Sequence, residues 1–329
     1  MSIQTAPAKS AFLITIDTEG DNLWGCGQNI ETRNARFLHR FQTLCERYGF
    51  KPSYLVNYEM AVDSAFIEFG RDLLMRGAGE VGMHLHAWNS PPLSSSYSTD
   101  LNHRPYLIEY PEQIMAEKIE YMTDLLRKTF DTSIVSHRSG RWAFNETYAK
   151  LLVKNGYFVD CSVTPWVSWR DSLGMAGGAG GTDYSSFPEH SYRINLADIS
   201  CKGLSPLIEL PMTIRPSLLQ RWMPKVMTNG VSGRIVRRLG GAPVWMRPNG
   251  SNLGELEQLA QSVARKGDAY LQFMLHSSEL MPGGSPTFPD SSSIEKLYVQ
   301  LEQLFALIAT MYKGETLKEH ATRIQGQLH

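Results

Sequence analysis

Short apolar runs alternate with amphipathic segments along this chain. The apolar runs are typical of buried strands, and they lie at residues 11–16, 54–56, 80–86, 134–136, 158–159, 207–211 and 269–275. The amphipathic segments predict helices at residues 30–48, 65–76, 111–126, 145–156 and 294–308. Because a helix between two strands lets those strands pair in parallel, the alternation predicts an α/β fold. We expect a mainly parallel sheet wrapped by helices, open or closed as a barrel.

The length of 329 residues suits one large α/β domain or two smaller ones, and we expect a single catalytic domain over residues 1–329. Residues 166–205 break the alternation and predict a loop-rich insertion. Within it, residues 174–181 are rich in glycine but lack the Lys-Ser/Thr pair and the strand–helix context of a phosphate-binding loop. We therefore interpret this stretch as a flexible loop that faces the substrate.

Composition excludes several classes of protein. The formal net charge of −1 gives no general attraction to nucleic acid. The sequence contains no run of eighteen apolar residues, so it predicts no membrane-spanning helix. Residues 1–10 do not resemble an export signal, and we therefore expect a cytoplasmic protein. The four cysteines lie far apart, which argues against a zinc–thiolate site and suits a reducing compartment.

Two histidines, His84 and His86, end the apolar run that begins at Glu80. In a strand, this spacing places both imidazoles on one face, where they can converge on one ion. The alternative is a pair of histidines whose ring nitrogens are satisfied by hydrogen bonds. The sequence segment therefore predicts a metal site or a polar strand end.

Carboxylates and a third histidine follow two other apolar runs. Asp17 and Glu19 come directly after the first run and share one parity, so both are expected to face one pocket at the carboxyl end of the sheet. A solvated acidic turn is the alternative. His276 ends the run at 269–275, where it suits acid–base chemistry near neutral pH or a hydrogen bond within the core.

These segments occur in a fixed order that resembles a known family. The set comprises Asp17-Thr18-Glu19, Glu80 to His84, Arg138 to Trp142, Asp160 and Leu275-His276. It resembles the polysaccharide deacetylases, the NodB-homology or family 4 carbohydrate esterases, over residues 10–280. Residues 80–92 and 276–285 resemble more narrowly the WalW-type deacetylases associated with lipopolysaccharide biosynthesis. The resemblance implies a distorted (β/α) barrel.

The resemblance also implies a role for each matching residue. Asp17 matches the general base, Arg138 the arginine that holds the base, and His276 the general acid. Glu19 falls where some members place the metal-binding carboxylate, and His84 matches the first metal histidine. These matches imply a hydrolase that binds a divalent metal, for which we expect zinc.

The remaining matches include two departures from the family pattern. Glu19 stands where the family has aspartate, and Trp88 occupies the position of the second metal histidine. His86 is the nearest substitute, so we expect zinc to be bound by Glu19, His84 and His86, with Asp17 as an alternative ligand. The candidate substrate-binding residues are Trp88, Arg141, Trp142 and Asp160, of which Asp160 matches the acid of the fourth motif.

The function expected from these residues is removal of an N-acetyl or other acyl group from an amino sugar in a polysaccharide or lipopolysaccharide precursor. The metal ion polarises the acetyl carbonyl and activates water, Asp17 takes the water proton, and His276 protonates the leaving amine. One alternative keeps the barrel but cleaves a cyclic amide or a glycoside. Another alternative, favoured by Trp88, is a metal-free pseudoenzyme that binds glycan.

Residues 215–247 carry seven basic residues together with Trp222 and Trp245. Such a mixture ordinarily forms a solvated surface, but it also suits anionic lipid or a lipid-linked sugar phosphate. We therefore expect a glycan or lipid-linked sugar as substrate, peripheral contact with the anionic inner face of a membrane, and no nucleic acid. The sequence does not predict the oligomeric state.

Overall fold

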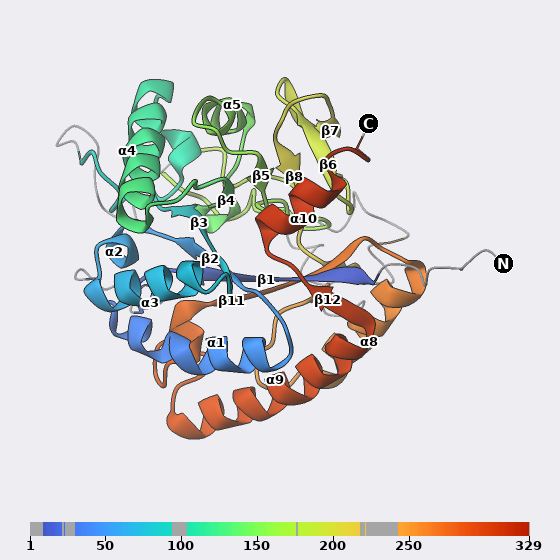
Figure 1. Cartoon of the computed structure of the whole chain (residues 1–329). Coiled ribbons are helices and arrows are strands. Elements are labelled where there is room, and N and C mark those ends of the chain that lie inside the picture. The colour runs from blue at the N-terminus through green and yellow to red at the C-terminus, as the bar shows by residue number, and fades with distance from the viewer. Residues whose placement is uncertain are drawn as a thin grey trace.

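The computed structural model describes residues 9–21, 23, 30–93, 104–175, 177–217, 221 and 243–328. Its centre is a curled sheet of ten strands (Figure 1). In spatial order these are β11 (Tyr270–His276), β1 (Ser10–Thr18), β2 (Ser53–Val56), β3 (Glu80–Leu85), β4 (Ser136–Ser139), β5 (Val159–Asp160), β8 (Ile208–Glu209), β6 (Tyr192–Asn195) and β7 (Asp198–Lys202), while β12 (Tyr312–Gly314) pairs with β1. Neighbours from β11 to β8 are parallel, which confirms the predicted α/β barrel-like fold.

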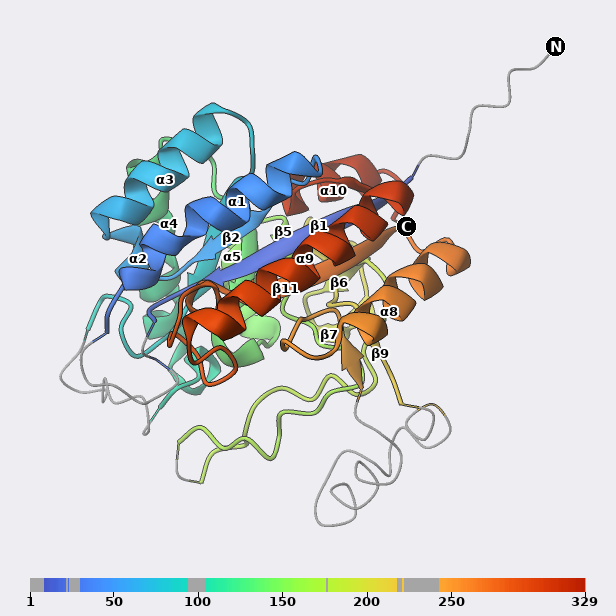
Figure 2. The ribbon, with the colours of Figure 1, turned by 90° about the horizontal axis from the view of Figure 1, so that it is seen from below.

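Helices wrap the outside of this sheet, and Figure 2 shows α1, α9 and α8 running alongside β1 and β11. The α-helices are α1 (Leu38–Arg47), α2 (Tyr58–Ala61), α3 (Ser64–Met75), α4 (Glu112–Phe130), α5 (Glu146–Lys154), α8 (Leu253–Lys266), α9 (Ser291–Met311) and α10 (Leu317–Ile324). Short 3₁₀ turns are η2 (Arg33–Phe37), η3 (Leu107–Glu109), η4 (Gly140–Trp142) and η5 (Ser277–Leu280). None of the helices in the described ranges is long and apolar enough to cross a membrane.

Strand β1 is apolar on both faces because both faces are covered. Phe12, Ile14 and Ile16 belong to the main core, whereas Ala11 and Leu13 pack into a second cluster on the other face. A central strand of a parallel sheet is buried on both sides, so its sequence reads as a continuous apolar run. This burial fixes the register of β1 and therefore the position of the polar residues that follow it.

The structure corrects several element boundaries predicted from the sequence. The segment 30–48 begins with η2 before α1, and the strand expected at 134–136 is β4, at 136–139. Elements missed by the periodicity are α8, α10 and β12, which lie in the last quarter of the chain. The helix predicted at 145–156 is α5, and Asn145 is its N-cap, since its side chain accepts a hydrogen bond of 2.9 Å from the Tyr148 amide.

The segment 166–205 is not loop throughout. It ends in the antiparallel hairpin of β6 and β7, and β6 pairs with β8 at the edge of the main sheet. A two-residue ladder between β9 (Ile214–Arg215) and β10 (Val244–Trp245) forms a separate small sheet. Hairpins do not need a crossover helix, which is why the alternation of strands and helices is interrupted in this segment.

The register of the parallel strands brings the polar strand ends together. Asp17 of β1 lies opposite His276 of β11, and His84 of β3 lies opposite Arg138 of β4. Because all four strands run in the same direction, their carboxyl ends open on one end of the barrel. The candidate site is therefore assembled where the sheet ends.

Candidate metal and catalytic site

A cavity of about 330 Å³ opens at the carboxyl ends of the strands. Eight of the residues singled out from the sequence line it: Asp17, Glu19, His84, His86, Trp88, Arg141, Trp142 and His276. Six further residues line it: Leu23, Tyr106, Ser139, Trp169, Ser172 and Arg247. Of these, Ser139 lies in the segment Arg138 to Trp142 and Arg247 in the basic segment 215–247, both of which the sequence singled out. Arg138 and Asp160 are not among the residues that line it.

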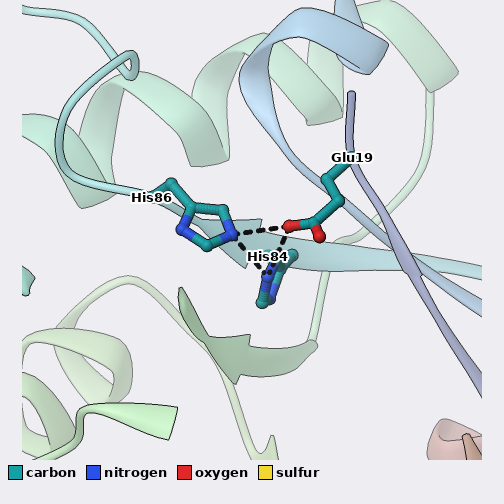
Figure 3. Close-up of side chains that lie close together, drawn as sticks. All are labelled: Glu19, His84 and His86. Carbon is teal, nitrogen blue, oxygen red and sulfur yellow. Dashed lines mark hydrogen bonds and ion pairs between the residues drawn. The ribbon is translucent and has the colours of Figure 1, made fainter. Parts of the chain in front are cut away.

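Glu19, His84 and His86 converge within this cavity, and Figure 3 shows the Glu19 carboxylate facing both imidazole rings. The Glu19 Oε2 atom lies 2.7 Å from His86 Nε2 and 3.6 Å from His84 Nε2. The two Nε2 atoms are 3.0 Å apart. All three residues are buried, so their ligand atoms face one another rather than bulk water.

The hydrogen bonds around the two rings fit a cation held by these three atoms. His84 Nδ1 lies 2.9 Å from the Arg138 carbonyl oxygen, so it carries a proton and leaves Nε2 as an acceptor. A proton on His86 Nε2 then faces both Glu19 and His84 Nε2. This leaves His86 Nδ1 buried and without a hydrogen-bond partner in the described chain. A cation in place of that one proton would attract all three ligand atoms.

Burial and charge set the protonation of these ligands. Burial would raise the pKa of Glu19, but its contacts with His84 and His86 outweigh this effect and hold the pKa well below its ordinary value. Burial lowers the pKa of His86 to about 4, despite its contact with Glu19. Burial would lower the pKa of His84, but the charge of Asp17 and the contact with Glu19 raise it above its ordinary value, so a divalent ion would have to displace a proton from this ring. One carboxylate with two histidines is a ligand set of catalytic zinc sites.

Asp17 is fixed beside this group by a buried arginine. Arg138 Nη1 donates a hydrogen bond of 2.6 Å to Asp17 Oδ1, and its Nη2 donates one of 2.9 Å to Thr15 Oγ1. Burial would raise the pKa of Asp17, but the charge of Arg138 is the main effect that overrides it and leaves this pKa below its ordinary value. Asp17 is therefore an ionised carboxylate with its second oxygen directed toward His276.

His276 lies between the acidic residues of the cavity and a second, more peripheral ion pair. Its Nε2 atom is 3.9 Å from Asp17 Oδ2 and 3.7 Å from Glu19 Oε1. On the other side of the ring, Nδ1 is 3.2 Å from Glu279 Oε2 and 3.0 Å from Arg247 Nη2. Arg247 also donates a hydrogen bond of 2.9 Å to Glu279. The imidazole is thus held at Nδ1, with Nε2 directed into the cavity.

The sequence did not assign Glu279 a role in the site. It follows His276 by three residues and closes the η5 turn, where its carboxylate accepts a hydrogen bond of 2.9 Å from the His276 amide. A carboxylate three residues after a turn start is the pattern of a capping box, and that signal was available in the sequence. Its pairing with Arg247, which lies 32 positions earlier in the chain, depends on a tertiary contact.

The buried Glu279 predicts a pH-dependent contribution to stability. Burial would raise its pKa, but the hydrogen bond with His276 and the charge of Arg247 lower it to about 2. A carboxyl whose pKa is lower in the folded state stabilises the fold above its unfolded pKa and loses this contribution as pH falls. We expect Glu279→Gln to lower the free energy of unfolding by about 3 kcal/mol near pH 7.

This difference from wild type should shrink as pH falls from about 4.5 toward 2. Urea titrations of both proteins at several pH values measure it. Glu295→Gln is a control, because Glu295 is an exposed carboxylate that pairs with Arg40 and does not line the cavity. A difference between Glu279→Gln and wild type that stays constant with pH would contradict this electrostatic account.

Tryptophans form the wall of the cavity. The Trp88 ring packs on the His86 ring at 4.0 Å between centroids, and the Arg138 guanidinium lies 4.9 Å from the Trp142 ring. Outside the predicted set, Trp169 also lines the cavity and lies 6.3 Å from Trp245. Flat aromatic faces beside polar groups are suited to sugar rings, whose axial C–H faces are apolar.

Part of the 166–205 segment reaches the cavity through Trp169 and Ser172. The Tyr106 hydroxyl donates a hydrogen bond of 2.7 Å to the Ser172 carbonyl, and the Met175 amide donates one of 2.8 Å to Glu109. The described part of the glycine-rich stretch 174–181 does not line the cavity. The part of this segment that faces the cavity therefore lies just before the glycine-rich stretch, at Trp169 and Ser172.

The structure does not bring Asp160 to the cavity. Asp160 is fully buried, and its Oδ1 atom lies 2.6 Å from His137 Nδ1 and 3.0 Å from the Ser162 hydroxyl. His137 in turn contacts the Tyr148 hydroxyl at 2.8 Å through Nε2. A carboxylate enclosed in this way has no free path to a substrate. Its contacts instead join β5 to β4 and α5.

The basic segment 215–247 is described only at its two ends and at Arg221. Trp222, Lys225, Arg234, Arg237 and Arg238 lie outside the described residues, so the membrane-contact hypothesis for them stays a prediction. Arg247, at the end of this segment, lines the cavity and pairs with Glu279. At least one of the clustered arginines therefore belongs to the candidate site.

Comparison with known proteins identifies the fold. No protein-family model and no curated protein matches the sequence. A structure assigned as a glycoside hydrolase/deacetylase from Parabacteroides distasonis is 9% identical, covers 98% of this chain and 73% of its own, and gives a TM-score of 0.61. One assigned as a polysaccharide deacetylase from Mycobacterium smegmatis is 13% identical, covers 99% and 96%, and gives 0.53.

A 4-α-glucanotransferase from Thermococcus litoralis is also similar, at 13% identity and a TM-score of 0.54, over 96% of this chain and 41% of its own. At such low identities, these likenesses establish the barrel-like fold that this chain shares with polysaccharide deacetylase structures. Since proteins of different activity share this fold, the chemistry has to be argued from the site.

Proposed function

We propose that this protein, which has the fold of polysaccharide deacetylase structures, is a metal-dependent hydrolase that removes an N-acetyl group from an amino sugar. The observation that carries the proposal is the convergence of Glu19, His84 and His86 with Asp17 and His276 on one cavity. Three ligand-type residues, an ionised carboxylate and a histidine meet the separate needs of amide hydrolysis. Tryptophans on the same cavity supply faces for a sugar ring.

The metal site is formed by Glu19, His84 and His86, whose ligand atoms lie within 4.8 Å of one another. A divalent ion there, which we propose to be zinc, supplies Lewis-acid chemistry: it polarises the acetyl carbonyl and makes water a better nucleophile. With three protein ligands, a bound ion would keep coordination positions open for substrate and water, as a catalytic site requires.

Asp17 and His276 are placed to move protons on either side of the scissile bond. Asp17 takes a proton from water, and Arg138 keeps the carboxylate ionised and oriented for this step. His276 donates a proton from Nε2 to the departing nitrogen, while Glu279 holds the ring at Nδ1. The scissile amide must then lie within reach of both side chains, whose Oδ2 and Nε2 atoms are 3.9 Å apart.

Cleavage of a glycoside is less well supported by the same geometry. A glycosidase needs one carboxyl group that stays protonated to serve as general acid. Both cavity carboxylates, Asp17 and Glu19, have pKa values below their ordinary ranges. His276 is then the available acid, which suits protonation of an amine in amide hydrolysis.

Acetate release tests this proposal. We expect the purified protein to contain about one equivalent of divalent metal and to release acetate from an N-acetylated chitooligosaccharide. Removal of the metal with a chelator should abolish release, and added zinc should restore it, because the carbonyl is no longer polarised without the ion. Release that is unchanged in metal-free protein would contradict the metal-dependent mechanism. Metal-free protein that binds the oligosaccharide without hydrolysis would support a pseudoenzyme instead.

For the natural substrate we propose a large, lipid-linked anionic precursor, such as one of lipopolysaccharide, at the cytoplasmic face of a membrane. The clustered arginines of 215–247 support this, because each basic residue near an anionic surface contributes about 1 kcal/mol of attraction. In the same series of experiments, salt-sensitive co-sedimentation with anionic vesicles should weaken in an Arg234/Arg237/Arg238→Ala variant. Absence of binding at low salt, together with fast turnover of a free monosaccharide, would contradict this part.

A further inference from the structure

Arg141 differs from the other arginines at the cavity in its partners. Arg138 is paired with Asp17, and Arg247 is paired with Glu279. Arg141 is exposed and lines the cavity, and no carboxylate within the described part of the chain forms an ion pair with it. Its guanidinium lies 5.5 Å from the centre of the Trp88 ring.

The backbone around Arg141 is held in a conformation that most residues avoid. Arg141 has φ = 53° and Trp142 has φ = 59°, so two consecutive residues other than glycine adopt left-handed geometry. Such strain persists only where surrounding contacts fix the chain, and it gathers at functional sites. Here the Tyr184 hydroxyl donates a hydrogen bond of 2.6 Å to the Trp142 carbonyl. The side chain of Arg141 is thus set toward the cavity by the fold.

The turn that carries Arg141 packs directly on the proposed metal site. A Cβ atom on Gly140 would lie 2.5 Å from the Leu85 carbonyl oxygen and 2.8 Å from His86 Nδ1, so only glycine fits there. Trp88 packs on His86 at 4.0 Å, and Arg141 lies over Trp88 at 5.5 Å. Arg141 is therefore separated from a proposed metal ligand by a single aromatic ring.

We infer that Arg141 binds an anionic group, a carboxylate or a phosphate, carried by the acetylated sugar or by its immediate neighbour. The inference rests on the proposed function, because it takes the sugar to be the one bound at Glu19, His84 and His86. When the face of a guanidinium contacts an aromatic ring, the N–H groups along the guanidinium edge can still donate hydrogen bonds to a carboxylate or a phosphate. Among the described residues that line the cavity, no carboxylate forms an ion pair with Arg141, so an anion on the substrate would supply the missing partner.

The test compares three sugars that differ in charge. The probes are N,N′-diacetylchitobiose, which is neutral, N-acetylmuramic acid, which carries a carboxylate, and N-acetylglucosamine 1-phosphate. Dissociation constants are measured by calorimetry with the metal-loaded protein in a His276→Ala background, which prevents turnover during the titration. We expect Arg141→Ala to weaken binding of one or both anionic sugars by about 10- to 100-fold, the usual weight of a charge-assisted hydrogen bond. Binding of the neutral sugar should change little.

Two further variants separate charge recognition from packing. Arg141→Lys keeps the charge and should retain part of the preference for the anionic sugars. Arg170→Ala is the matched control, since Arg170 is an exposed arginine of the adjacent segment, near Asp183 and outside the cavity lining. The sugar whose binding responds to Arg141 identifies the anion as carboxylate or phosphate.

Each outcome separates this inference from the proposed function. Equal loss of affinity for all three sugars, or no loss, would overturn the inference, because Arg141 would then only support Trp88 or contribute nothing. If the wild-type protein releases acetate but Arg141→Ala does not weaken binding of the anionic sugars more than that of the neutral one, the inference is overturned and the proposed function stands. Arg141-dependent binding of anionic sugars by a protein that releases no acetate overturns the proposed function and leaves the anion site in place.

Discussion

Replacing Asp17 by asparagine is expected to lower kcat for acetate release by about 10²- to 10⁴-fold, the usual weight of a proton-transfer group. Asparagine can still accept the hydrogen bond that Arg138 donates at 2.6 Å, so the side chain should keep its place. It cannot take a proton from water. His276→Ala should lose activity to a similar extent and retain its metal, because His276 is not one of the three proposed ligands.

A matched control for this prediction is Asp21→Asn. Asp21 is a buried carboxylate only four residues away, but it pairs with Arg33 and does not line the cavity. Activity of that variant should stay close to wild type. Thermal melts exclude unfolding as the cause of any loss in Asp17→Asn. Turnover near wild type in Asp17→Asn or His276→Ala, on any substrate that the protein accepts, would refute the proposed proton-transfer roles.

The second large effect concerns metal content. His84→Ala should strip the divalent ion from the purified protein and abolish acetate release while the fold remains intact. One of the three proposed ligands is lost, and Glu19 then faces His86 alone, across their 2.7 Å contact. Elemental analysis of the purified variant measures the loss directly, before any assay of activity.

The control for that experiment is His190→Ala, because the His190 side chain is 72% exposed and lies outside the cavity. This variant should keep the metal content of wild type. Circular dichroism of both variants reports whether secondary structure is retained. Full metal occupancy in His84→Ala would show that Glu19, His84 and His86 do not form the metal site.

Local patterns in the sequence were sufficient to predict the strand ends that form the site. The two-residue period of a strand puts Asp17 and Glu19 at one parity, and it places His84 beside His86. In the structure all four residues line one cavity. These predictions succeeded because each depends on a few adjacent residues and on the burial of a parallel strand.

Asp160 shows where a sequence pattern is insufficient. Its place in the order of motifs predicted contact with substrate, yet it is enclosed beside His137 and Glu209. In β5, Asp160 lies opposite His137 of β4 and Glu209 of β8. A motif gives the position of a residue along the chain, but neighbouring strands decide whether its side chain meets a cavity or another buried polar group.

The sequence by itself determined the alternation of strands and helices, and therefore the parallel sheet whose carboxyl ends carry Asp17, His84 and His276. Only the tertiary structure decided which charges are compensated. Arg138 reaches Asp17 across 121 positions of sequence, and Arg247 reaches Glu279, whereas Arg141 is left facing the cavity. The physical reason is that periodicity is a local property, while electrostatic pairing depends on the curl and order of the strands, which the whole chain sets.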